Sequence, residues 1–96
     1  MSEEAAGTIT VRLVMPDRWL EHVVELPTQT TVEDAKRMGL RAMLLRDTDE
    51  PADYYVEYAE RKVADEAASL GTIGFRSRDI LSIWAYDLGH YRAFEG

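Results

Sequence analysis

The chain has 96 residues, of which 46% are hydrophobic, and a formal net charge of −7; these values favour one domain with a modest core and disfavour nucleic acid and anionic membranes as partners. The absence of cysteine excludes disulfides, thiolate metal sites and a cysteine nucleophile. Because residues 1–7 are acidic and no apolar run could span a bilayer, we expect a cytoplasmic protein without a signal peptide and with a disordered N-terminus.

The first elements are predicted to form a β-hairpin. The stretch TITVRLVM alternates, so that every second residue from Ile9 to Leu13 falls on one face of a strand. Residues 16–18 (PDR) are typical of a turn, and WLEHVVEL follows as a second strand with Leu20 to Leu26 alternating in the same way. The short gap between the two strands favours a hairpin connection.

A change of period after Pro27 predicts one helix. Thr31 is a favourable N-cap, and two acidic residues follow it in the first turn, where the helix dipole favours anions. Glycine is unfavourable inside a helix, so Gly39 suggests a close approach of the helix to a sheet. The residues at helical spacing form one stripe: Val32, Ala35, Gly39 and Met43.

Two further long strands are predicted after a charged loop at 46–53. In YYVEYAER, Tyr54, Val56 and Tyr58 share one side and Tyr55 and Glu57 the other. Residues 62–75 are irregular, with a short strand expected near residue 63 and a helical turn at 67–70. The last strand is ILSIWAY, and connection handedness favours placing it beside the first strand and parallel to it. One sheet wrapped around one helix is the expected result.

This order of elements resembles the β-grasp fold of the ubiquitin family. LPTQTTVEDAK is similar to that family's strand end, threonine cap and helix start, and KVADEAASLGTIGFRSRDILSIW to its short strand, acidic bend, buried leucine, turn and closing strand. The resemblance implies an α+β domain at residues 8–87, with a four- to five-stranded mixed sheet around one helix, and a C-terminal tail at 88–96. It makes the acidic bend at 65–66 structural, and its core positions fall on Val56, Val63, Leu70, Phe75, Leu81 and Ile83.

The resemblance also implies a recognition surface, but with different side chains. Glu57 stands where the family has an exposed isoleucine, Ser82 where it has a histidine, and Trp84 where it has an exposed valine. Receptors of ubiquitin's aliphatic patch are therefore not expected to bind. Trp84, with neighbouring Tyr86, is a candidate aromatic anchor for a partner. The alternative is that Trp84 packs on its own sheet or tail.

The tail departs from the family's Gly-Gly ending. Aligned from the core, those glycines fall on Gly89 and His90, and the sequence continues to Gly96. Glycine suits activation of a carboxyl group because no side chain obstructs a narrow active site. The conjugation terminus is then Gly96, or Gly89 after proteolysis, unless neither is used. Residues expected to dock the tail, whether on its own domain or on a partner, are Leu88, His90, Tyr91 and Phe94.

The resemblance thus implies a modifier, plausibly bacterial, that is joined to a target by an isopeptide or ester bond. Its partners are an activating enzyme, a conjugating enzyme and a processing peptidase. The chain is expected to be a monomer when free and not an enzyme, with no cofactor or metal, since the activating enzyme holds the ATP. Its lysines are Lys36 and Lys62, while Arg61 stands at the family's best-known branching position. The alternatives are a non-covalent accessory module, as in type VII secretion, and a sulfur carrier.

Overall fold

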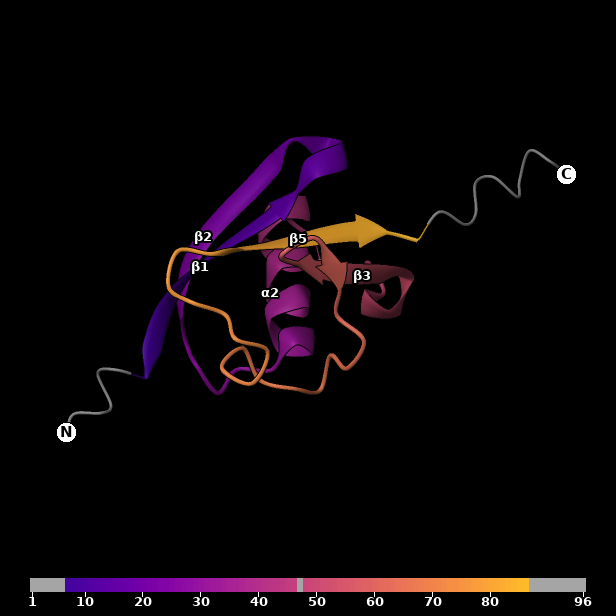
Figure 1. Ribbon diagram of the computed structural model, residues 1–96. Coiled ribbons are helices and arrows are strands. Elements are labelled where there is room, and N and C mark those ends of the chain that lie inside the picture. The colour runs from indigo at the N-terminus through magenta and orange to yellow at the C-terminus, as the bar shows by residue number, and fades with distance from the viewer. Residues whose placement is uncertain (1–6, 47, 87–96) are drawn as a thin grey trace, which may run out of the picture.

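The computed structural model describes residues 7–46 and 48–86, which form five strands and one α-helix (Figure 1). Residues 1–6 of the N-terminal segment expected to be disordered (1–7), and the expected tail at 88–96, therefore lie outside the described residues. In chain order the elements are β1 (Thr8–Met15), the 3-10 turn η1 (Pro16–Arg18), β2 (Leu20–Pro27), α2 (Val32–Leu44), the 3-10 turn η2 (Pro51–Asp53), β3 (Tyr54–Tyr58), β4 (Arg61–Lys62) and β5 (Ile80–Ala85).

The strands form one mixed sheet in the order β2-β1-β5-β3-β4. β1 is antiparallel to β2 and parallel to β5, while β3 is antiparallel to both β5 and β4. The predicted α+β β-grasp architecture is therefore confirmed, including the parallel pairing of the first and last strands. Leu13 lies opposite Leu81 and Val56 opposite Ile83, and these four side chains face the helix from the middle of the sheet.

Helix α2 packs across one face of this sheet (Figure 1). The Thr31 hydroxyl accepts a hydrogen bond from the amide of Asp34 at 3.1 Å, as predicted for an N-cap. Gly39 allows the close approach that its place in the helix suggested. A Cβ added there would lie 3.1 Å from Ile83 Cδ1 and 3.2 Å from Leu13 Cδ1, tighter than ordinary contacts in a packed core.

The segment between β4 and β5 differs from the sequence-based prediction. The short strand expected near residue 63 is present as β4, which ends at Lys62, but residues 67–70 form turns, a bend and a bridge instead of a helical turn. Long-range backbone bonds decide this: Ser69 pairs with Thr31 in an isolated bridge, and the amide of Leu70 donates to Thr30 at 2.8 Å. Within residues 7–46 and 48–86, no helix has the length and apolar character that crossing a membrane requires.

Candidate interaction surface on the outer face of the sheet

The face of the sheet opposite α2 carries the predicted recognition residues. Because side chains alternate along a strand, the outward residues of β3 and β5 meet in register. Tyr55 lies opposite Trp84, and Glu57 lies opposite Ser82. The tertiary structure therefore brings Glu57, Ser82 and Trp84 together on one surface, as the resemblance implied.

An aromatic cluster, defined as Tyr55, Trp84 and Tyr86, occupies one end of this surface. The rings of Tyr55 and Tyr86 are tilted, with centroids 5.0 Å apart. The Lys62 ammonium lies 5.4 Å from the Tyr55 centroid and 4.9 Å from the Tyr86 centroid, within the range of cation–π attraction. Interaction with the Tyr86 hydroxyl raises the pKa of Lys62 above its ordinary value. The cluster therefore presents aromatic surface together with the positive charge of Lys62, which lies over the Tyr55 and Tyr86 rings.

Trp84 is half-buried, so it is neither a fully exposed anchor nor a core residue. Its indole Nε1 is buried and has no hydrogen-bond partner among the described residues. Buried donors in folded proteins nearly always have an acceptor. Trp84 thus packs partly on its own sheet, as in the alternative prediction, and the rest of its side chain is exposed to solvent.

A shallow hollow of about 450 Å³ lies beside Glu57, between the β3–β4 turn and the start of β5. Its lining includes Glu60 and Asp79, so the hollow is acidic. The Tyr58 hydroxyl donates to the Asp79 carboxylate and also lies 3.0 Å from the carbonyl oxygen of Gly74. The bond from Tyr58 holds the pKa of Asp79 below its usual range and raises the pKa of Tyr58. A basic group on a partner would complement this hollow.

The predicted tail residues Leu88, Gly89, His90, Tyr91, Phe94 and Gly96 lie outside the described part of the chain. The structure does fix the point from which the tail begins. The amide of Tyr86 donates to the carbonyl oxygen of Asp53 at 2.9 Å, which ties the end of β5 to η2. Tyr86 is 37% exposed, and its ring contacts Tyr55 on the neighbouring strand rather than extending away from the sheet.

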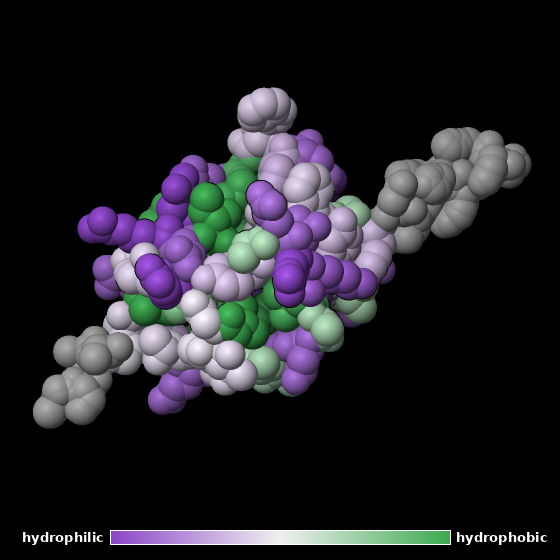
Figure 2. All heavy atoms as spheres, in the orientation of Figure 1, coloured by the Kyte–Doolittle hydropathy of each residue, from purple (hydrophilic) through white to green (hydrophobic). Residues whose placement is uncertain are grey.

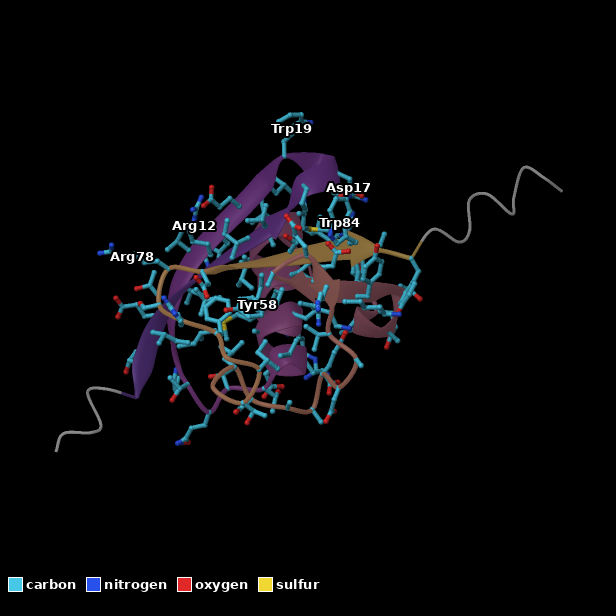
Figure 3. The ribbon with its side chains drawn as sticks, in the orientation of Figure 1. Arg12, Asp17, Trp19, Tyr58, Arg78 and Trp84 are labelled. Atoms are coloured by element: carbon cyan, nitrogen blue, oxygen red, sulfur yellow. The ribbon has the colours of Figure 1, made fainter. Side chains whose placement is uncertain are left out.

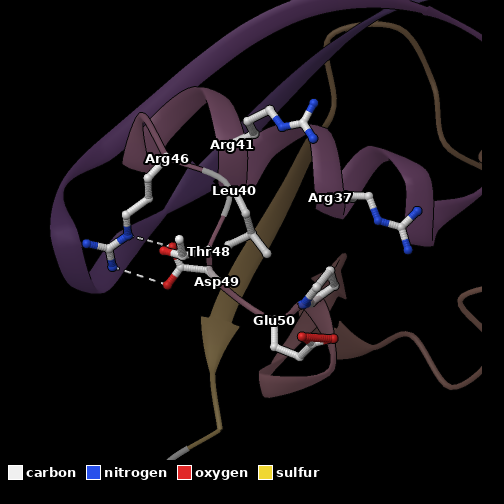
Figure 4. Close-up of a pocket in the computed structure, with 8 residues that line it drawn as sticks. Arg37, Leu40, Arg41, Arg46, Thr48, Asp49 and Glu50 are labelled. Atoms are coloured by element: carbon white, nitrogen blue, oxygen red, sulfur yellow. Dashed lines mark hydrogen bonds and ion pairs between the residues drawn. The ribbon is translucent and has the colours of Figure 1, made fainter.

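A second concavity lies between α2 and the charged loop after it, and its contacts are structural (Figure 4). The Arg46 guanidinium binds Asp49 in a bidentate pair, at 2.7 and 3.1 Å, and the Tyr54 hydroxyl donates to the same carboxylate. The pair with Arg46 lowers the pKa of Asp49, while burial raises the pKa of Tyr54. Among the described residues, no group of His, Asp and Glu is arranged to hold a metal ion.

Three residues were not predicted from the sequence as parts of an interaction surface. Tyr55 could have been found, because it shares the outward side of its strand with Glu57. Lys62 could not, because its place above two rings depends on β4 folding back on β3. Trp19 was assigned to the second strand but lies at the hairpin turn, 93% exposed. The sequence feature that could have indicated this position is that Trp19 directly follows the turn residues 16–18.

Comparison with solved structures confirms the ubiquitin-like β-grasp fold. A ubiquitin-like domain of an Arabidopsis thaliana protein aligns with a TM-score of 0.70 at 17% identity, over 91% of this chain and 86% of that one. Ubiquitin from Caldiarchaeum subterraneum aligns with a TM-score of 0.68 at 19% identity, over 86% and 99%. A designed protein based on ubiquitin gives 0.68 at 14% identity, over 88% and 95%. No family model and no curated protein matches the sequence.

Proposed function

From this ubiquitin-like fold, we propose that the chain is a protein modifier whose carboxyl-terminal glycine is activated and transferred to a target. The observation that carries the proposal is the topology. The five strands of the described residues lie between Thr8 and Ala85, and β5 is already paired on both edges, with β1 and with β3. The segment after Tyr86 is thus not needed to complete the sheet. Gly96 is the proposed conjugation terminus, with Gly89 as the alternative after trimming.

The proposed chemistry is carried out by partner enzymes in a reducing compartment such as the cytoplasm. A carboxylate oxygen of the terminal glycine forms a bond to the α-phosphorus of ATP, and pyrophosphate leaves. A thiolate of the activating and then of the conjugating enzyme attacks the carbonyl carbon, and AMP leaves in the first of these steps. An amine or a hydroxyl of the target finally displaces the thiolate. Because the chain has no cysteine, it supplies the carboxyl group and docking surfaces only.

Recognition in this proposal uses the outer face of the sheet. The aromatic cluster contributes rigid apolar area, and the acidic hollow beside Glu57 selects a partner with a basic group. The tail residues Leu88, His90, Tyr91 and Phe94 would dock in the enzyme that receives the terminus. If Gly89 is the mature end, a processing peptidase releases it.

The test is to incubate the full chain with ATP and the activating and conjugating enzymes encoded near its gene, and to record intact masses. An adenylate, a thioester or a covalent adduct on the wild type supports the proposal, and deletion of Gly96 should abolish it. Loss on Gly89→Val with retention after Gly96 deletion would point to trimming. An adduct that survives both changes would show that the tail carboxyl group is not the reacting group.

A second candidate is a non-covalent ubiquitin-like interaction module. The aromatic cluster favours it, because this surface could bind a partner without any reaction at the tail. In that case a variant lacking residues 87–96 would keep its binding, whereas Trp84→Ala would lose it. A sulfur carrier shares the activated glycine, and its product would be a thiocarboxylate that the same mass measurement would distinguish.

A further inference from the structure

The most exposed large hydrophobic side chain of the described residues is Trp19, at the tip of the β1–β2 hairpin. Figure 3 shows it projecting from the tip, away from the sheet, and the space-filling view in the same orientation shows a protrusion over the hairpin end of the molecule (Figure 2). The indole is 93% exposed. Tryptophan carries a large apolar area, and full exposure of that area brings the free protein no stability.

The backbone at Trp19 is also unfavourable for this residue. Its φ of 56° and ψ of 37° lie in the left-handed region, where a bulky side chain is rare and glycine or asparagine is the usual choice. The 3-10 turn at Pro16–Arg18 fixes this conformation, and the amide of Trp19 donates to Pro16. The turn therefore holds the indole outward, above a shallow apolar hollow of about 430 Å³ that includes Val14 and Leu20.

The hairpin tip lies at the end of the sheet from which the chain leaves the fold. β1 and β5 are parallel, with Val14 opposite Ser82, so both strands run toward this end. The same register carried two residues further brings Trp84 level with Pro16, and η1 lies beside β5. Figure 3 shows Trp84 on β5 beneath the tip that carries Trp19. Trp19 therefore lies at the same end of the sheet as the end of β5.

We propose that Trp19 anchors a second contact, in which the hairpin tip inserts into an apolar pocket of the activating enzyme that binds the segment after Tyr86; this rests on the proposed function. The pocket carries basic groups at its edge, because the incoming chain has a net charge of −7. A second copy is a poorer occupant. Two copies would bring equal negative charges together, and one indole with its hollow is far smaller than the roughly 800 Å² per partner of a stable dimer.

The test measures adenylation by pyrophosphate exchange, with the activating enzyme encoded near the gene and the full chain as the varied substrate. Trp19→Gly suits the left-handed backbone and should leave the fold intact. We expect its apparent KM to rise about tenfold or more with kcat within about twofold, as for the loss of an interface anchor. The apparent KM of Trp19→Phe should lie between those of the wild type and Trp19→Gly. Met38→Ala, which changes an exposed hydrophobic residue on α2, is the matched control and should leave KM unchanged.

A second readout shows whether the indole itself is covered. The chain has two tryptophans, so 5-fluorotryptophan labelling gives two fluorine resonances, and Trp19→Gly assigns them. The Trp19 resonance should shift or broaden when the enzyme is added. Exchange kinetics of Trp19→Gly equal to those of the wild type would overturn the inference while leaving the proposed function in place. No exchange by the wild type would overturn both.

The same labelled protein also tests two other partners for Trp19, a second copy of the chain and a membrane surface. Sedimentation of the free chain should show a monomer, and a dimer that Trp19→Gly dissociates would overturn the inference in favour of a second copy. Phosphatidylcholine vesicles should leave the Trp19 resonance unchanged, and a shift with vesicles would favour a membrane surface instead.

Discussion

The ammonium of Lys36 lies 2.6 Å from a carboxylate oxygen of Glu66 and 2.9 Å from the carbonyl oxygen of Tyr54. Lys36 is only 4% exposed, so one buried charge joins the helix, the turns before β5 and the start of β3. The amide of Glu33 also donates to the carbonyl oxygen of Glu66, which fixes this turn against the N-terminus of α2. The acidic bend thus has the structural role that was expected for it.

Removing one partner of this pair should strongly destabilise the fold. Lys36→Met leaves Glu66 and the Tyr54 carbonyl without their donor, and we expect a loss of about 3 kcal/mol in the free energy of unfolding. Lys36→Met with Glu66→Gln should recover part of that loss, giving a non-additive double-mutant cycle in urea denaturation. Arg37→Met is the control, because Arg37 makes exposed pairs with Glu33 and Asp34, and it should change stability by less than about 1 kcal/mol.

The bond between Tyr58 and Asp79 predicts a pH dependence of stability. The folded-state pKa of Asp79 lies below its unfolded value, because its carboxylate accepts from the Tyr58 hydroxyl and the Arg76 amide. A lowered pKa contributes stability above the unfolded value near 4, and this contribution is lost as the pH falls through the folded value. Asp79 is half-exposed, so we expect a contribution of only about 1 kcal/mol.

Asp79→Asn should therefore be less stable than the wild type at pH 6 and should lose less stability on acidification. Urea denaturation between about pH 6 and pH 2 measures this difference. Tyr58→Phe should show the same smaller acid dependence, because it removes the main donor to the carboxylate. Parallel stability curves for the wild type and Asp79→Asn would contradict the assignment.

The β3–β4 turn contains strain that a substitution can relieve. Ala59 and Glu60 have φ of 55° and 67°, and they connect Tyr58 to Arg61, which are paired. Two-residue turns of this geometry favour Asn-Gly. Glu60→Gly should stabilise the protein by about 1 kcal/mol, because glycine adopts positive φ without steric cost. Glu60→Gln removes the same charge but keeps the side chain, so a matching gain in thermal stability for that control would assign the effect to charge.

The two lysines should differ in their reactivity toward acylating reagents. Lys36 is buried and should not react in the native protein. The raised pKa of Lys62 lowers its neutral, nucleophilic fraction at pH 8, so it should react more slowly than a free lysine. Tyr86→Leu removes the interaction that raises this pKa and should speed the reaction, as measured by peptide mass after brief acetylation. Equal rates for Lys62 in the wild type and in Tyr86→Leu would contradict this prediction, and both lysines should react alike in denaturant.

The sequence by itself determined the elements and much of the topology of this protein. The alternation in residues 8–15 and 54–58, the Thr31 cap and the helical stripe are local patterns, and the structure has the elements they predict. Gly39 is an informative case: its low helix propensity indicated close packing, and the Leu13 and Ile83 side chains account for it. The register of β3 and β5 followed from the fold, so the outward position of Glu57 and Trp84 was predictable as well.

Only the tertiary structure decided which side chains are buried or engaged in contacts and which are exposed. Lys36 is one of two lysines in the sequence, and only in the folded chain is it buried and paired with Glu66, thirty positions away. Tyr86 was predicted as a neighbour of Trp84, and the structure adds the contacts of its ring with Tyr55 and Lys62. The left-handed backbone and exposure of Trp19 depend on how η1 closes the hairpin. Pattern and propensity act over a few residues, whereas burial, ion pairing and exposure depend on residues that meet only when the chain has folded.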